Sequence, residues 1–161
     1  NKIDGLASAR VIFHNVYGEW CDFDLNTSQV IPALIKKAHD LKAGDRLEVW
    51  GDGKQARSFI NSYDIAHSLL VMITGEVPIN DFDSVQLGSK NGTTIEELSK
   101  IILQKCGKDP SLIKYINPNY QGDIGRIPDL TLSKKLGLVQ SVGIHQGIEE
   151  LIDWAKNNGK I

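Results

Sequence analysis

Two arginines are the residues of this chain best suited to bind an anion. Arg57 follows the turn-forming stretch Gly51-Asp52-Gly53, and Arg126 stands three residues before Asp129. A guanidinium held by a strand presents a planar fork of donors, which suits a phosphate better than a flexible lysine does. Each arginine alone fits equally well as a solvated surface residue, or as one paired with a nearby carboxylate such as Asp129. Taken singly, neither position decides between binding and a surface role.

Asn15 is a third polar candidate, because it closes the apolar stretch Ala9–Phe13. A side-chain amide at that place can donate and accept toward a ligand at the carboxyl edge of a sheet, or bind its own backbone in an Asx turn. No metal site is expected. The four histidines show no HxxxH or HxH spacing, and Cys21 and Cys106 have no partner at CxxC or CxxH spacing.

The chain contains no motif that would make it catalytic on its own. No GxGxxG or GxxxxGK[ST] loop occurs, and no tyrosine has a lysine four residues later. We therefore assign no catalytic residue and expect no complete dinucleotide or P-loop site.

Composition predicts one domain over residues 1–161, because a chain of this length with 41% hydrophobic residues can bury one core. The net charge of -2 and the lack of a basic run argue against nucleic acid and anionic membranes as partners. No apolar stretch is long enough to span a bilayer. The two cysteines make no disulfide framework, so the cytoplasm is the expected compartment. The only methionine is Met72, so the chain looks like a processed or partial product.

Strands and helices are expected to alternate, which predicts the α/β class, with α+β as the alternative. Residues 46–59 are expected to form a β-hairpin that reverses at the glycines and projects Arg57. The other expected elements are a buried strand at 9–13, a brief strand at 85–87, a strand at 112–116 and a loop at 117–125. Helices are expected from an N-cap at Thr27 or Ser28 to about Asp40, from a cap at Ser62 or Asp64 to Ile73, and at 95–106, 130–136 and 145–157. The expected helix caps are Thr27 or Ser28, Ser62 or Asp64, and Thr94 in a capping box.

Four segments together resemble the carboxyl-terminal half of extended short-chain dehydrogenase/reductase enzymes. They are Arg10–Gly18, Leu47–Phe59, Val85–Ser89, and Gly125–Asp129 followed by Lys135-Leu136-Gly137. The nearest patterns are those of nucleotide-sugar epimerases and dehydratases, GDP-mannose 3,5-epimerase-like sequences in particular. Trp-Gly-Asp-Gly-x-Gln-x-Arg-Ser-Phe is the most specific motif. The resemblance implies a Rossmann-type enzyme whose amino-terminal dinucleotide-binding half is lacking here, with residues 1–18 as the end of the Rossmann sheet.

The resemblance also implies a site for the diphosphate of a nucleotide sugar. Arg57 and Arg126 would clamp the diphosphate, and Asn15 would touch it. Asp129 would hold a ribose hydroxyl or orient Arg126. Two arginines from distant segments would then meet over one dianionic group.

Further positions follow from the same resemblance. Val30 would line the nucleotide pocket, with Leu47 and Val49 packed at its base. Phe13 and His14 would lie near the nicotinamide end of the cleft. NAD or NADP would serve the intact enzyme, and this chain alone is expected to bind neither.

The implied function is the nucleotide-sugar-binding part of an NAD(P)-dependent epimerase or dehydratase, an isomerase or a lyase. The loop from Glu19 to Asn26 matches no version tied to one sugar, and Glu19 stands where the family often has proline, so a GDP-sugar and a UDP-sugar both stay open. Other readings also stay open: an NAD(P)-dependent nucleotide-sugar reductase, a non-catalytic binding subunit, and an inert fragment. The partners implied are the amino-terminal Rossmann half and a second copy in a homodimer.

Overall fold

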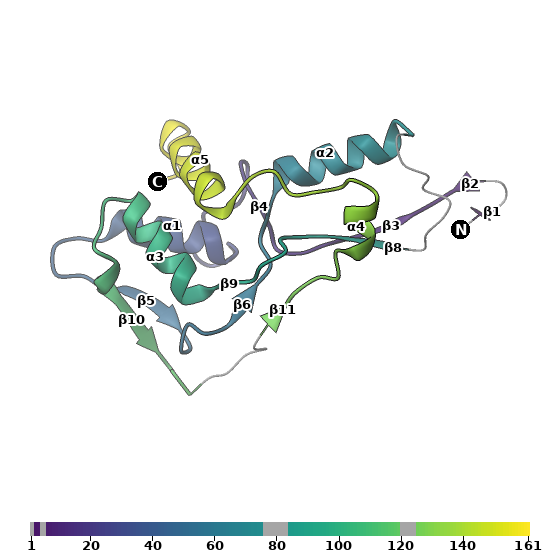
Figure 1. The fold of residues 1–161 in the computed structure, drawn as a ribbon. Helices are drawn as coiled ribbons and strands as arrows, with labels where there is room; N and C mark the ends of the chain where they lie inside the picture. Colours follow the sequence, from purple (N-terminus) through teal and green to yellow (C-terminus); the bar gives the residue numbers. More distant parts are fainter. Residues whose placement is uncertain (1, 4–5, 76–83, 120–124) are drawn as a thin grey trace.

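Short strands and helices alternate along the chain, as expected for the α/β class (Figure 1). The computed structural model describes residues 2–3, 6–75, 84–119 and 125–161. The strands are β1 Lys2–Ile3, β2 Leu6–Ala7, β3 Arg10–Phe13, β4 Val16–Tyr17, β5 Leu47–Trp50, β6 Ala56–Arg57, β7 Ile60–Asn61, β8 Ser84–Leu87, β9 Thr93–Thr94, β10 Ile113–Ile116 and β11 Gly125–Arg126. The helices are α1 Val30–Asp40, α2 Ser62–Ile73, α3 Ile95–Lys105, α4 Thr131–Lys135 and α5 Ile144–Asn157, with a 3₁₀ turn at Pro110–Leu112.

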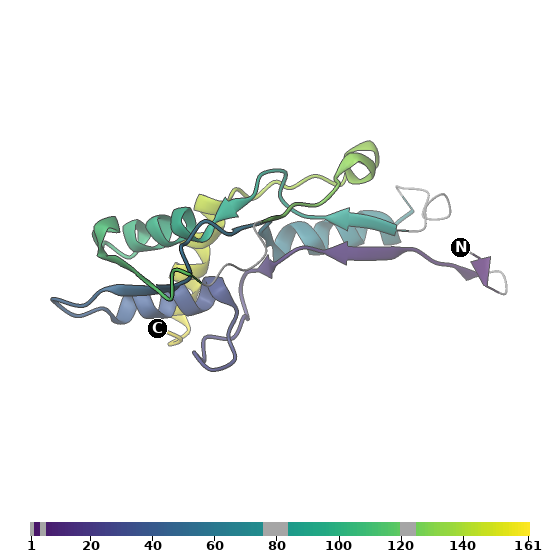
Figure 2. The same cartoon turned by 90° about the horizontal axis from the view of Figure 1, so that it is seen from below.

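Most strand pairs are parallel. They are β3 with β8, β4 with β7, β5 with β10, and β6 with β11, whereas β6 with β9 and β1 with β2 are antiparallel. Parallel neighbours need a crossover connection, which the helices between them supply. The two termini lie at opposite ends of the elongated chain (Figure 2). No helix among the described residues combines the length and the apolar content that crossing a bilayer requires.

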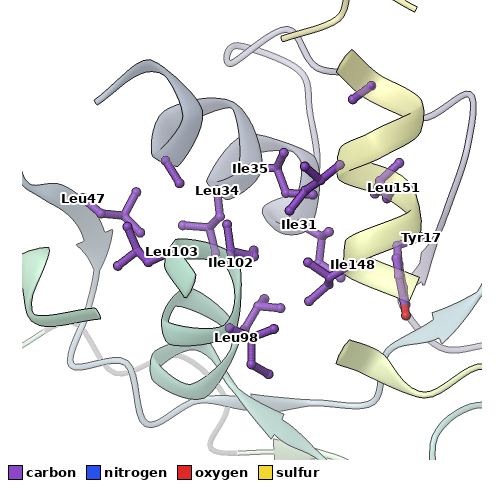
Figure 3. Packing of buried hydrophobic residues seen from close by; sticks show 14 of the residues in the cluster. Tyr17, Ile31, Leu34, Ile35, Leu47, Leu98, Ile102, Leu103, Ile148 and Leu151 are labelled. Atoms are coloured by element: carbon purple, nitrogen blue, oxygen red, sulfur yellow. The ribbon is translucent and has the colours of Figure 1, made fainter. Parts of the chain in front are cut away.

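The larger core packs α1, α3 and α5 together, with Leu47 of β5 on the side away from α5 (Figure 3). The buried residues of α1 and α5 recur at helical spacing, so each of these helices buries one apolar face. Burying each leucine or isoleucine contributes about 1.5–3 kcal/mol. The fully buried members of this core include Ile31, Ile35, Ala38, Leu98, Ile102, Leu103, Ile148 and Leu151.

A second, smaller core joins α2 and α4 to β8. Its buried members include Ile65 and Met72 from α2 and Val85 and Leu87 from β8. These elements lie at the end of the chain that carries β3 and the amino terminus (Figure 1).

The expected hairpin over residues 46–59 is wrong. The turn is present, with positive φ at Gly51 (79°) and Gly53 (75°), but β5 pairs with β10, and β6 pairs with β11 and β9. Backbone bonds at the turn explain the divergence: the Gly51 amide donates to the carbonyl of Ile116 at 2.9 Å, and the Gly53 carbonyl accepts from the amide of Glu96 at 2.9 Å. The turn at these glycines therefore connects β5, which pairs with β10, to β6, which pairs with β11 and β9.

The expected burial of the first strand is also wrong. Arg10, Ile12 and Phe13 of β3 are exposed and Val11 is half-buried, because β8 is its one neighbour among the described strands. The strand expected at 85–87 is present, one residue longer. Residues 125–126, expected to be loop, form β11, and residues 120–124 of that expected loop lie outside the described residues.

Helix bounds agree better with expectation than helix caps do. Helices α1 and α2 end at Asp40 and Ile73, as expected. Their N-caps are Gln29 and Asn61 rather than the expected Thr27 or Ser28 and Ser62 or Asp64. The Thr94 cap is confirmed, because its hydroxyl accepts from the amide of Glu97 at 3.0 Å.

Candidate functional site

Arg57 and Arg126 lie side by side on neighbouring strands. Strand β6 runs between β11 and β9, and the register places Arg126 opposite Arg57 and Arg57 opposite Thr93. Residues in register on adjacent strands share a face of the sheet, about 4.8 Å apart. Two distant segments therefore bring two guanidinium-bearing residues to one face.

Arg57 donates hydrogen bonds to two neighbouring residues. Its Nη1 donates to the carbonyl of Ala56 at 2.8 Å and its Nη2 to Oε1 of Gln55 at 3.5 Å. Both acceptors are uncharged. Two guanidinium groups on one face could share an anionic group, because each offers a planar fork of donors.

Thr93 is in register with Arg57 and Arg126, and the sequence analysis did not identify it. It is buried and lies opposite Arg57. A single threonine before a helix cap carries no distinctive signal, and only the pairing of β9 with β6 places it here.

Asn15 is tied to the segment that carries Arg57. Its Nδ2 donates to the carbonyl of Ser58 at 3.0 Å, and its own carbonyl accepts from the amide of Ile60 at 3.3 Å. The side chain therefore does not form the Asx turn that was the alternative. The backbone of Asn15 has a φ of 26°, a left-handed value that asparagine tolerates better than most residues. This arrangement holds Asn15 next to β6.

A pocket of about 220 Å³ contains both Asn15 and Val30. Phe59, Thr27 and Gln29 also line it. The two positions that the resemblance gave to the diphosphate and the nucleotide therefore share one cavity.

The first turn of α1 opens on this pocket without a side-chain cap. Gln29 is the N-cap and makes no side-chain capping bond. The hydroxyl of Ser28, one of the expected caps, is buried with no hydrogen-bond partner among the described residues. Uncapped amides and the positive end of a helix dipole favour an anion.

Comparison with known proteins decides the family. The sequence model of the NAD dependent epimerase/dehydratase family matches residues 2–88. A putative UDP-glucose 4-epimerase from Methanocaldococcus jannaschii is 30% identical over 99% of this chain and 49% of its own length. The chain belongs to the NAD dependent epimerase/dehydratase family. The resemblance to extended short-chain dehydrogenases/reductases is thereby confirmed.

Two further matches support the family at the levels of sequence and fold. The dTDP-4-dehydro-6-deoxy-D-allose reductase of Streptomyces bikiniensis is 30% identical over 89% of this chain and 42% of its own length. The crystal structure of a GDP-L-fucose synthetase from Naegleria fowleri superposes with a TM-score of 0.82 at 20% identity, over 93% of this chain and 46% of that one. The chain thus spans less than half the length of these epimerase/dehydratase relatives.

Leu47 and Val49 are buried in the larger core. They are 0% and 2% exposed and belong to the core between α1 and α3. Side chains buried to this degree cannot touch a ligand. Their burial is compatible with the prediction that they pack beneath the site.

Asp129 is anchored locally. Its Oδ1 accepts from the amide of Thr131 at 2.9 Å, at the start of α4. Hydrogen bonds from the side chain and backbone of Thr131 lower the pKa of this exposed carboxyl group. It therefore stays charged near Arg126, as a role in orienting that side chain requires.

The role of Phe13 and His14 near the nicotinamide end of the cleft stays a prediction. Phe13 is exposed at the end of β3, and Nε2 of His14 donates to Oε1 of Gln86 at 2.9 Å. The sequence has no GxGxxG loop, the motif that binds the phosphates of a dinucleotide. We assign no chemical step to these residues.

Tyr17 lines the pocket that contains Asn15 and Val30, and its hydroxyl group has an unusual environment. The hydroxyl is buried without a hydrogen-bond partner among the described residues. Burial is the main cause that raises the pKa of Tyr17 to about 12. The side-chain amide of Asn61 lies beside it without reaching hydrogen-bond geometry, and offsets only part of the rise.

This raised pKa predicts a loss of stability in alkali. The folded protein keeps the proton of Tyr17 above pH 10, where the unfolded chain releases it, so stability falls from pH 10 to 12. A pKa shift of about two units corresponds to a loss of up to about 2.7 kcal/mol. Urea unfolding across this range should show that loss in the native protein and not in Tyr17→Phe. Equal slopes for the two proteins would contradict the prediction.

Proposed function

We propose that this chain is the nucleotide-sugar-binding part of an NAD(P)-dependent epimerase, dehydratase or reductase. The observation that carries the proposal is the register of β6 and β11, which sets Arg57 beside Arg126. The diphosphate is the group that all nucleoside diphosphate sugars share. Two forks of donors on one face suit its charge and its spread of oxygens.

We propose that the nucleotide lies in the pocket that contains Asn15 and Val30. Asn15 would contact the sugar diphosphate, and the start of α1 would add its amides and dipole. Asp129 would hold a ribose hydroxyl or orient Arg126. Leu47 and Val49 would keep β5 fixed beneath the site.

We propose that the chemistry is supplied by an amino-terminal Rossmann half, which would bind NAD(P) and carry the acid and base groups. This chain would then bind the sugar and orient it. Support comes from β3, whose residues Ile12 and Phe13 are exposed on a strand with a parallel partner on one side. Residues 1–18 would thereby form the end of the Rossmann sheet. Homodimer formation, a cytoplasmic location and the GDP-mannose 3,5-epimerase likeness stay predictions.

The ligand proposed is a UDP- or GDP-sugar, since relatives are named for UDP-, GDP- and dTDP-linked sugars. Calorimetric titration with UDP, GDP and dTDP, each against its monophosphate, tests this. We expect a diphosphate to bind about tenfold or more tightly than its monophosphate, because the second phosphate adds a charged contact to arginine. Equal affinities, or no binding of any nucleotide, would contradict the function.

A further inference from the structure

A second pocket differs in charge from the arginine face. It lies between the loop after β4 and the first turns of α2 and α5, with a volume of about 640 Å³, within the range of pockets that hold small molecules. Its lining includes the carboxylates Glu19 and Glu150 and no lysine, arginine or histidine among the described residues. It shares no lining residue with the Asn15–Val30 pocket. Two carboxylates and no cation in the described lining favour a positively charged ligand over a diphosphate at this pocket.

Two aromatic rings on the pocket wall are largely exposed. Trp20 is 83% exposed and Tyr63 is 63% exposed. The ring of Trp20 touches the ring of Trp154, with centroids 5.5 Å apart and planes tilted by 60°. Its backbone has a φ of 67°, a left-handed conformation that a bulky side chain rarely adopts. Holding a tryptophan in that conformation with its ring in water is unfavourable, and a ligand covering the ring would offset the cost.

The floor of the pocket has a negative field. Gln146 donates from Nε2 to Oε1 of Glu150 at 2.8 Å and so holds that carboxylate in place. Beneath it the hydroxyl of Tyr17 lies so close to Gly147 that a Cβ there would be 2.2 Å from the phenolic oxygen. Burial first, and then the charges of Asp64 and Glu150, raise the pKa of Tyr17 to about 12.

We propose that this pocket binds a small organic cation of the ammonium or guanidinium class. Glu150 and Glu19 supply the opposite charge, and the faces of Trp20 and Tyr63 cover the alkyl or planar part of the ligand. A cation over an aromatic face is attracted by the ring quadrupole, most strongly by that of tryptophan. The site goes beyond nucleotide-sugar binding and does not depend on it.

Titration with choline tests the site, followed by saturation transfer to the choline methyl protons in NMR. The uncharged carbon isostere 3,3-dimethyl-1-butanol is the matched ligand control. We expect choline to saturate a single site and to bind about threefold or more tightly than the isostere, since the ring and carboxylate contacts require charge. Trp20→Ala and Glu150→Gln should each weaken choline about threefold or more.

Glu149→Gln is the matched protein control. Glu149 neighbours Glu150 in sequence, is exposed, and pairs with Lys105 at 2.5 Å instead of lining the pocket. Glu149→Gln removes the same formal charge as Glu150→Gln does and should leave choline binding unchanged. UDP binding should be the same in Trp20→Ala as in the native protein, which separates this site from the nucleotide site. Absence of choline saturation, equal binding of the isostere, or native affinity in Glu150→Gln would overturn the proposal.

Discussion

Arg57→Ala and Arg126→Ala will each weaken UDP or GDP binding by about ten- to a hundredfold. A hydrogen bond to a charged group is worth about 1.5–3 kcal/mol, and each 1.4 kcal/mol is about tenfold in affinity. The two residues lie opposite each other in the register of β6 and β11, so both would contact one diphosphate. The double variant should therefore lose less than the sum of the two single losses in free energy, because each variant disturbs the same shared ligand.

Two controls separate a fork of donors from a simple positive charge. Arg57→Lys keeps the charge and loses the planar fork, so its affinity should fall between those of the native protein and Arg57→Ala. Arg46→Ala removes the same charge from an exposed position before β5 and should bind UDP or GDP as the native protein does. Titration calorimetry at fixed salt measures all five variants. Losses in Arg57→Ala and Arg126→Ala no larger than that in Arg46→Ala would contradict the shared diphosphate site.

The pairing of the two arginines shows where sequence reasoning succeeds and where it stops. The glycines of the Gly51-Asp52-Gly53 turn were recognised, because their positive φ is a local requirement. The partners of β5 and β6 were not, because strand pairing depends on segments far away in the chain. A hairpin is the most local pairing that such a turn allows, and it would pair β5 with β6. Here β5 pairs with β10 instead, and β6 pairs with β11. The sequence alone could suggest that Arg57 meets Arg126 only through a family resemblance.

Helices were predicted well for the same physical reason. An apolar stripe at helical spacing is a property of neighbouring residues, so α5 was found within a residue of its observed bounds and α1 within two. Helix starts were less predictable, because several polar residues near each start can act as caps. Ser28 illustrates this, since its hydroxyl is buried at the expected cap position and caps nothing. The contact from Asn15 to the Ser58 carbonyl had no local signal at all.

Asp64 was expected as a possible cap of α2, and its observed role is larger. Asn61 caps the helix, accepting from the amide of Tyr63 at 2.9 Å. Asp64 is 2% exposed, and its Oδ1 accepts from the amide of Ser141 at 2.9 Å and from the hydroxyl of Ser141 at 2.6 Å. Its Oδ2 accepts from the amide of Val142 at 3.2 Å. One buried carboxyl group thus ties α2 to the segment that leads into α5.

We expect Asp64→Ala to lower the free energy of unfolding by about 3–4 kcal/mol. The substitution removes three hydrogen bonds and leaves a buried backbone amide at Val142 without an acceptor, a combination that belongs to the large-effect class of mutations. Asp109→Ala is the matched control, since that exposed carboxylate accepts one bond from the amide of Ser111 at 2.8 Å and should cost about 1 kcal/mol. Urea unfolding followed by circular dichroism measures both, with an unchanged slope indicating the same unfolding transition. If Asp64→Ala costs no more than Asp109→Ala, the carboxyl group does not hold α5 in place, and the 640 Å³ pocket that α2 and α5 share must be formed by the apolar contacts of Val142 and Leu151 alone.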